Sequence, residues 1–470
     1  MSEYLLAAGF AAYLLGVLVL GFRAWRRTRD RADYLLGGRS LGRVVAALSA
    51  GASDMSGWLL LGLPGFAYAS GVQALWLVAG LLIGAWLNWR FVAARLREQT
   101  ARMGNALTLP AWFAARFPDR ARALRLAASV LIVCFFLFYT ASGLVAGGKL
   151  FGTVFGWDYR LAVVIGAAII VLYTVFGGFL AVSWTDVFQG LLMLAALVLT
   201  ALLATALPDA NGTVRPADRL LDPFASPDGG AIGLLGIVSL AGWGLGYFGQ
   251  PHVLARFMAL RDAGLATGAR RIGIGWAATA MLAAVWVGLA GTVLAPGLDG
   301  TSRETVFIVL VEQLFHPAVA GLLLAAVLAA IMSTADSQLL VCASALADDL
   351  PGLAGVQLDE RRALMASRAA VVGIALIATA LAWSPDNAVL DLVAYAWGGL
   401  GAVFGPAILF ALYSRRVTGT AILAGMLIGA IAIVAWHNLS GGLFELYELV
   451  PAFVLASVVI AVFSRRAPAR

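Results

Sequence analysis

Apolar runs of about twenty residues alternate with short polar stretches along almost the whole chain. A helix needs about 20 predominantly apolar residues to cross the hydrocarbon core of a bilayer, so each run predicts one membrane-spanning helix. We predict thirteen spans, at residues 4–22, 43–69, 72–94, 126–148, 160–180, 187–207, 231–255, 272–295, 318–346, 367–384, 390–413, 418–437 and 447–464. The pattern therefore predicts an all-α polytopic membrane protein.

The second predicted span contains a stretch that lipid does not favour. Residues 48–60 hold three serines, two glycines and the acid Asp54. An ionisable residue at bilayer depth costs roughly 2.5–3.5 kcal/mol on insertion scales, so Asp54 must face protein, water or a cation. A helix that breaks here exposes backbone carbonyls that can replace the hydration shell of Na+. A packing face of small residues is the alternative, but it leaves the acid unpaired.

A polar segment rich in Pro, Gly and Asp, residues 209–230, separates two groups of five spans. The first span of each group is interrupted by glycines, at residues 48–60 and again at residues 239–251. Because five is an odd number, the second group is inserted upside down relative to the first. Interrupted spans at matching places in inverted halves indicate the central site of a transporter, so we predict an inverted five-plus-five core with broken helices.

This core divides the chain into six parts. They are the first span with a basic cytoplasmic loop (1–42), the first repeat of five helices (43–208), an external loop (209–230), the first four helices of the second repeat (231–384), its fifth helix (385–414), and two peripheral helices with a short cytoplasmic tail (415–470).

Composition agrees with a membrane protein. Hydrophobic residues make up 62% of the chain and charged residues 12%, and the mean hydropathy is +0.92, which lies outside the range of soluble domains. The pI near 9.7 could suggest a nucleic-acid partner, but the arginines lie in loops beside the spans, where they orient a membrane protein. We therefore expect the lipid bilayer as the surroundings and no nucleic acid, and nothing indicates an oligomer.

The basic residues fall almost entirely on one side of the predicted spans. Alternate loops and the C-terminal tail carry 27 of the 32 lysines and arginines, and the other loops carry five. Loops rich in Lys and Arg remain in the cytoplasm. The C-terminus is therefore predicted to be cytoplasmic and, with an odd number of spans, the N-terminus to be outside.

Two further acids lie in or at the edge of predicted spans. Asp186 stands at the start of the sixth span, where it could cap the helix or handle an ion. Asp336 lies in the ninth span close to Ser333 and Thr334, and hydroxyl, carbonyl and carboxylate oxygens together suit a hard cation. Hydrogen bonds from the two hydroxyls to their own helix are the alternative.

Trp243 and Tyr247 are four residues apart, so on a helical stretch they would share a face, with glycines around them. Such a ring pair beside a broken helix suits a small zwitterion with an apolar body, whose ammonium or iminium group lies over an aromatic face. Aromatic packing in the core of the bundle is the alternative.

Five motifs resemble the sodium:solute symporters, and within that family the bacterial branch that carries proline. The similarity runs from near residue 5 to about residue 465. The motifs are Gly37–Ser40, Ser49–Trp58, Gly177–Asp186, Gly242–Met258 and Met332–Thr334. The resemblance implies the LeuT-type inverted repeat, a bacterial cytoplasmic membrane location, and Na+-coupled import of L-proline by alternating access without enzymatic chemistry.

The resemblance also implies a Na+ site and a coupling acid. The ligands would be the backbone carbonyls of Ala52, Met55 and Ala330 and the hydroxyls of Ser333 and Thr334. Asp54 matches the sodium-coupling acid, Arg39 a cytoplasmic-side residue tied to ion coupling, and Asp186 an acid that some relatives use for a second Na+. Asp336 departs from the pattern of the proline branch, so it could serve a second cation or stay protonated.

For proline, the matching positions are Ser56, Gly57, Trp58, Tyr139, Trp243, Tyr247 and Pro251. A Na+- or H+-coupled symporter of another small amino acid or a carboxylate is the main alternative. A sensor built like a transporter, or a channel, is a more distant one, since a channel needs rings of carbonyls or charges along one open path.

The predicted orientation can be tested by chemical labelling. In a version without Cys134 and Cys342, single cysteines are introduced as Gly212→Cys or Glu360→Cys. An impermeant thiol reagent added to intact cells is expected to label position 212 and to leave position 360 unlabelled. Labelling of position 360 from outside would reverse the orientation.

Overall fold

The computed structural model describes residues 2–25, 31–176, 178–206, 216–226, 230–349 and 359–465. Helices dominate these ranges, and their extended pairing consists of two isolated backbone bridges, Leu41 with Leu260 and Ala225 with Ala231. The prediction of an all-α chain is confirmed.

The main helices lie over the apolar runs. In chain order they are α1 (Ser2–Trp25), α3 (Arg43–Asp54), α4 (Leu63–Ser70), α5 (Ala74–Asn88), α6 (Ala94–Arg102), α8 (Ala121–Phe155), α9 (Tyr159–Phe176), α10 (Phe179–Ala206), α11 (Leu234–Gly242), α12 (Pro251–Met258), α13 (Ala266–Leu294), α15 (Pro317–Ser344), α17 (Glu360–Leu381), α18 (Val389–Tyr413), α19 (Gly419–His437) and α20 (Leu449–Arg465). Shorter helices stand between them, including α2 (Arg31–Leu36), α7 (Leu109–Arg116) and α14 (Val306–Leu314).

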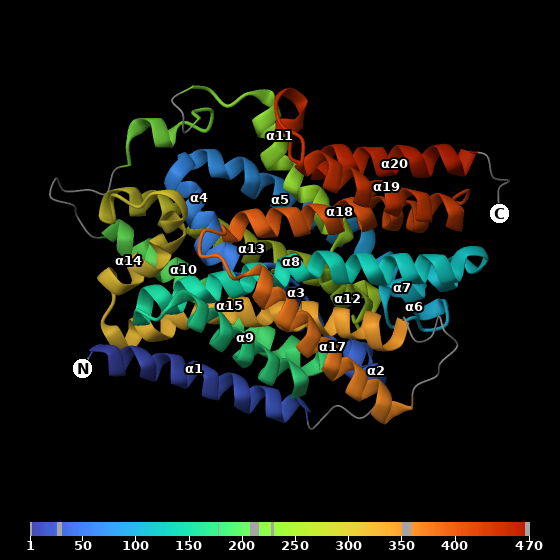
Figure 1. The fold of residues 1–470 in the computed structure, drawn as a ribbon, viewed down its shortest axis with the longest axis horizontal. Coiled ribbons are helices and arrows are strands. Elements are labelled where there is room, and N and C mark those ends of the chain that lie inside the picture. The colour runs from blue at the N-terminus through green and yellow to red at the C-terminus, as the bar shows by residue number, and fades with distance from the viewer. Residues whose placement is uncertain are drawn as a thin grey trace.

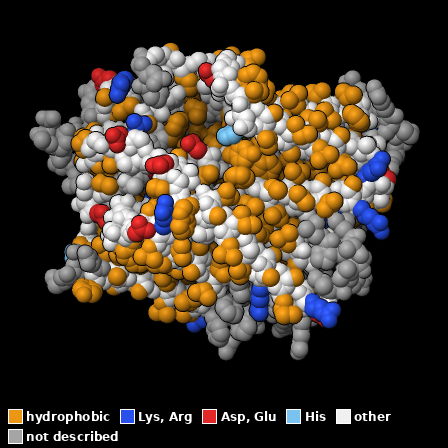
Figure 2. Space-filling model, viewed as in Figure 1, with side chains coloured by type: hydrophobic (Ala, Val, Ile, Leu, Met, Phe, Trp, Pro, Cys, Tyr) orange, Lys and Arg blue, Asp and Glu red, His pale blue; other side chains and the backbone are white. Residues whose placement is uncertain are grey.

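Within the described ranges, eight helical stretches are long and apolar enough to cross a membrane, and four shorter apolar helices accompany them. The long helices run roughly along one axis of the molecule, with α1 at one edge of the bundle and α19 and α20 at the opposite edge (Figure 1). Hydrophobic side chains make up most of the middle of the face in Figure 2. This is the arrangement of a helical bundle whose sides face lipid.

Two helices break in mid-course, as predicted. α3 ends at Asp54, Met55 leaves the helical region with φ −90° and ψ 80°, and a wide helical turn, η2 (Trp58–Gly62), leads into α4. In the second case α11 passes into a 3-10 helix, η7 (Trp243–Gly249), and α12 starts afresh after the extended residue Gln250. Pro251 begins α12 because the first position of a helix needs no backbone N–H.

Glycines let one broken helix touch its neighbour backbone to backbone. A Cβ atom on Gly84 of α5 would lie 2.0 Å from the carbonyl oxygen of Gly244 in η7. One turn earlier, a Cβ on Gly80 would lie 2.2 Å from the carbonyl oxygen of Ala241. A side chain at Gly80 would therefore force α5 away from α11, and one at Gly84 would force it away from η7.

Two sequence interpretations need correction. Asp186 lies well inside α10, which begins at Phe179, so it does not cap that helix. The 27 basic residues assigned to the cytoplasmic side include Arg256, which lies in α12 with 1% of its surface exposed. Arg256 is therefore not an exposed orientation signal, which leaves 26 of the 27 in that count.

Candidate functional site

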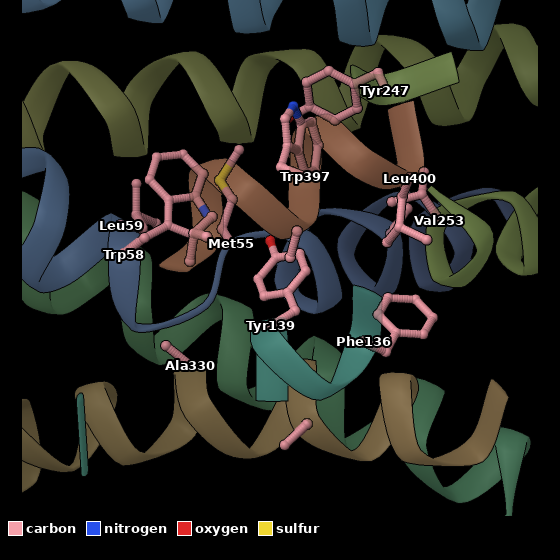
Figure 3. Close-up of a cluster of buried hydrophobic side chains, with 14 of the residues drawn as sticks. Met55, Trp58, Leu59, Phe136, Tyr139, Tyr247, Val253, Ala330, Trp397 and Leu400 are labelled. Atoms are coloured by element: carbon pink, nitrogen blue, oxygen red, sulfur yellow. The ribbon is translucent and has the colours of Figure 1, made fainter. Parts of the chain in front are cut away.

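Asp54 lies at the break of α3, 1% exposed, and three aromatic side chains donate hydrogen bonds to it. Figure 3 shows these three side chains, Trp58, Tyr139 and Tyr247, among the buried residues of this region. The Tyr247 hydroxyl donates to Asp54 Oδ2 at 2.6 Å. The Trp58 indole N–H and the Tyr139 hydroxyl both donate to the Asp54 backbone carbonyl at 3.1 Å. Asp54 Oδ1 has no hydrogen-bond partner among the described residues. The carboxylate is thus held in place but only half satisfied, which leaves room for a cation or a polar substrate to complete it.

The predicted cation ligands from α3 and α15 meet beside this break. The Ser333 hydroxyl lies 2.8 Å from the Ala52 carbonyl oxygen and 3.1 Å from that of Ala330. The Thr334 hydroxyl lies 3.5 Å from the same Ala52 carbonyl. Met55 follows the last residue of α3 and has non-helical backbone angles. Carbonyl and hydroxyl oxygens without nitrogen or sulfur donors form a set that fits Na+.

The two aromatic residues of η7 contact different partners. The Trp243 ring stacks on Tyr447 with centroids 5.2 Å apart, and the Tyr247 ring meets Trp397 edge to face at 4.9 Å. The expected common face is absent because η7 is a 3-10 helix, in which residues three apart, and not four apart, lie above one another. Tyr247 therefore reaches Asp54, while Trp243 packs toward the loop before α20.

The remaining predicted substrate residues lie at the two breaks. Ser56 and Gly57 form the link between α3 and η2, and both are buried. A Cβ on Gly57 would lie 2.6 Å from the Ala146 side chain, so this link is pressed against α8. Pro251 lines a cavity that extends toward Arg256. The sites around the two breaks thus lie on neighbouring elements of the bundle.

A buried ion pair that the sequence did not reveal lies one helical turn from Ser333. Arg256 donates to Asp186 Oδ2 at 3.0 Å and to the Ser337 hydroxyl at 2.5 Å. The Ser49 hydroxyl donates to the same carboxylate oxygen at 2.6 Å and accepts from Arg256 Nε at 3.0 Å. These four residues, the Arg256 cluster, join α3, α10, α12 and α15.

Local sequence gives little sign of the Arg256 cluster. An arginine at the end of a span is normally an orientation signal. Only the position of Arg256 inside the motif Gly242–Met258 could have pointed to a further role.

Asp336 occupies a separate buried position. Thr174 on α9 lies 2.5 Å from Asp336 Oδ1, and Asp336 Oδ2 has no partner among the described residues. Tyr13 on α1 is a further residue that the sequence did not single out. Its hydroxyl accepts from Gln189 at 2.9 Å and lies 3.6 Å from the sulfur of Met332, the residue before Ser333. The first helix thus contacts the segment that carries the predicted ligands.

Arg39 joins the ends of several helices. Its guanidinium donates to Asn105 Oδ1 at 2.8 Å, to the Met258 carbonyl at 2.6 Å and to the Ala106 carbonyl at 2.8 Å. Burial, with a smaller effect from the positive charge of Arg97, lowers the pKa of Arg39 to about 10. Arg39 stays protonated at neutral pH, so its guanidinium can donate all of these hydrogen bonds in this conformation of the loop.

Apolar helices that break in mid-course around a buried carboxylate define a secondary transporter. Residues 34–429 match the model of the sodium:solute symporter family. The chain is 46% identical to the sodium/proline symporter of Escherichia coli (strain K12), over 97% of this chain and 92% of the relative. It is 45% identical to the high-affinity proline transporter PutP of Bacillus subtilis (strain 168), over 95% and 94%. The chain belongs to the sodium:solute symporter family, and it is a multi-pass membrane transporter and not an enzyme.

Solved structures show the same fold. A substrate-bound, outward-open Na+-coupled sialic acid symporter aligns with a TM-score of 0.80 at 19% identity, over 100% of this chain and 99% of its own. Mhp1, a nucleobase-cation-symport-1 family transporter, in a closed conformation with bromovinylhydantoin bound, aligns with a TM-score of 0.59 at 17% identity, over 94% and 97%. The chain therefore has the LeuT-type fold of these transporters.

The buried ion pair predicts a characteristic pattern of stability. Asp186→Leu leaves the Arg256 charge without its partner and is expected to cost about 3–5 kcal/mol of stability. The double variant Asp186→Leu/Arg256→Met removes both charges and should be more stable than Asp186→Leu alone. Thermal unfolding of the purified protein in detergent measures both effects. Additive losses in the double variant would show that the two side chains do not act as a pair.

Proposed function

We propose that this protein is a sodium-coupled symporter that imports L-proline by alternating access. The observation that carries the proposal is the meeting of the Ser333 and Thr334 hydroxyls with the Ala52 carbonyl beside the break of α3. The names of the relatives, which are 45–46% identical to nearly the whole chain, supply the substrate.

The finer architecture is part of the proposal. Thirteen spans form an inverted five-plus-five core, with one helix before it and two after it. The two breaks fall in α3–α4 and α11–α12, which open the two groups of five. In Figure 1 the start of α1 and the end of α20 lie at opposite ends of the long axis, as an odd number of spans requires. With the basic residues inside, the N-terminus is outside and the C-terminus in the cytoplasm of a bacterial cell.

Na+ is held by the carbonyls of Ala52, Met55 and Ala330 and the hydroxyls of Ser333 and Thr334. Asp54 lies between the ligands Ala52 and Met55 in the chain, and its carboxylate supplies negative charge that attracts the ion. Binding of the ion fixes α3 against α15, completes the substrate pocket and favours closure of the outer side. Inward movement of one charge across 100 mV supplies about 2.3 kcal/mol, before any Na+ gradient.

Proline lies between the two breaks. Ser56, Gly57 and Trp58 form one wall, and Tyr139 and Tyr247 reach toward the same place because both donate to Asp54. Trp243 and Pro251 close the pocket on the side of η7 and α12. The iminium group of proline meets aromatic faces or the half-satisfied carboxylate of Asp54, and its carboxylate meets backbone N–H groups at a helix start or Na+.

Three charged residues serve coupling rather than substrate contact. Arg39 holds the ends of helices together on the cytoplasmic side and is released when that side opens. Asp186 is neutralised by Arg256, which takes the place of a second cation. Asp336 has one oxygen without a partner among the described residues, and it serves a second cation or a proton.

The ligand assignment predicts a separation of ion and substrate effects. Ser333→Ala and Thr334→Ala each remove one coordinating oxygen, so the Na+ concentration for half-maximal proline uptake should rise at least about tenfold. At saturating Na+ the affinity for proline should stay near the wild-type value. Ser344→Ala, on the same helix but bonded to the Leu340 carbonyl, is the matched control and should behave as wild type. Unchanged Na+ activation in both variants would contradict the assignment.

The substrate pocket is tested with Trp243→Ala and Tyr247→Ala. If these rings line the pocket, proline affinity falls about two- to thirtyfold in the folded protein, because a cation–π or hydroxyl contact is lost. Tyr447→Ala, which removes the stacking partner of Trp243, is the matched control and should lower only the amount of folded protein.

The measurement is Na+-dependent binding of [3H]proline to purified variants, normalised to folded protein. Wild-type affinity in the folded fraction of both pocket variants would favour simple core packing. Competition by other small amino acids and by carboxylates in the same assay separates proline from the alternative substrates.

A further inference from the structure

Arginines gather around Tyr413, at the end of α18. The guanidinium of Arg95 on α6 lies 4.1 Å above the ring of Tyr413, the last residue of α18. The Tyr413 hydroxyl donates to the Phe91 carbonyl at 2.7 Å, so the ring is fixed in place. The guanidinium of Arg90 lies 5.3 Å from the Phe91 ring. Arg95 and Arg90 thus each form a cation–π contact with an exposed aromatic ring.

The positive charge here is not neutralised by protein. Arg415 and Arg416 follow Ser414 after the end of α18, and they are exposed, as are Arg90 and Arg95. Among the residues that the structure describes, none of these four arginines forms an ion pair. The acid nearest in sequence, Glu98, lies 3.8 Å from Arg102 instead. The guanidinium N–H groups of the four arginines remain available to an outside anion.

A shallow groove of about 350 Å3 lies beside these arginines. It is an open depression along one helix, lined by Leu409, Phe410 and Tyr413 of α18 and by Ser414, the next residue in the chain. The Ser414 hydroxyl accepts from the Arg416 backbone N–H at 3.3 Å, which places the start of the basic loop at this end. The surface therefore combines an open apolar groove on a membrane helix with positive charge that forms no ion pair among the described residues.

We propose that this surface binds an anionic glycerophospholipid, with its phosphate held by Arg95 and Arg416 and an acyl chain in the groove. A planar guanidinium matches phosphate oxygens in a two-point geometry, and stacking on Tyr413 holds Arg95 ready for it. Basic pockets beside membrane helices attract anionic lipid headgroups. A soluble anion would explain the arginines but not the apolar groove, so charge and shape together select a lipid.

The test uses the purified full-length protein after removal of native lipid. Native mass spectrometry follows titration with palmitoyl-oleoyl-phosphatidylglycerol or with the phosphatidylcholine of the same chains. Wild type is expected to bind the anionic lipid at least about tenfold more tightly. Arg95→Gln/Arg416→Gln should remove most of that preference. Arg261→Gln/Arg362→Gln removes the same charge from two exposed arginines elsewhere and should keep it.

Two further experiments distinguish the contribution of the groove from that of the headgroup. Leu409→Trp fills the groove and should weaken phosphatidylglycerol binding several-fold, and excess glycerol phosphate should not displace the bound lipid. Na+-dependent proline binding to each variant confirms that it is folded.

The proposal is overturned by any of four results. These are equal binding of the two lipids to wild type, equal losses in the two arginine pairs, wild-type binding by Leu409→Trp, or displacement by glycerol phosphate.

Discussion

The structure is organised around the carboxylate of Asp54, which lies inside a bundle of apolar helices. Asp54 is buried in mid-bundle, and an isolated carboxylate at that depth is too costly to leave without partners. Three aromatic donors converge on it, and α3 stops there, so that its backbone carbonyls face protein instead of continuing a helix. The break of α3 and the hydrogen bonds to Asp54 therefore occur at the same residue. Asp54 Oδ1 is left without a hydrogen-bond partner among the described residues.

Buried charge recurs elsewhere in the bundle, and each time it ties several helices together. Glu304 forms an ion pair with Lys149 of α8, and it also accepts from the backbone N–H groups of Val389 and Leu390, where α18 begins. A carboxylate at the start of a helix is stabilised by the unpaired N–H groups there. The Arg256 cluster likewise joins four helices through a buried ion pair and hydrogen bonds. Buried charges of this kind thus connect helices that are distant in sequence.

The apolar runs predict the all-helical class and the positions of the long apolar helices, because a spanning segment must be about twenty apolar residues long whatever its neighbours are. The break at Asp54 is also visible in the sequence, since an unbroken spanning helix rarely accommodates an acid among glycines and serines. The burial of Arg256 is not visible. It depends on Asp186, which is 70 residues away along the chain, and no local pattern records such a contact. The separate partners of Trp243 and Tyr247 escape prediction for a related reason, because a 3-10 turn replaces the expected α-helical spacing.

The contact between α5 and η7 has a mechanical consequence. Gly80 and Gly84 each leave space for a backbone carbonyl of the facing segment, and the residues beside them, such as Leu81 and Ala85, carry side chains that would collide there. The two elements therefore fit together in a single register and cannot slide past each other by one residue. Any rearrangement that moves the second broken helix must therefore move α5 with it as one rigid unit.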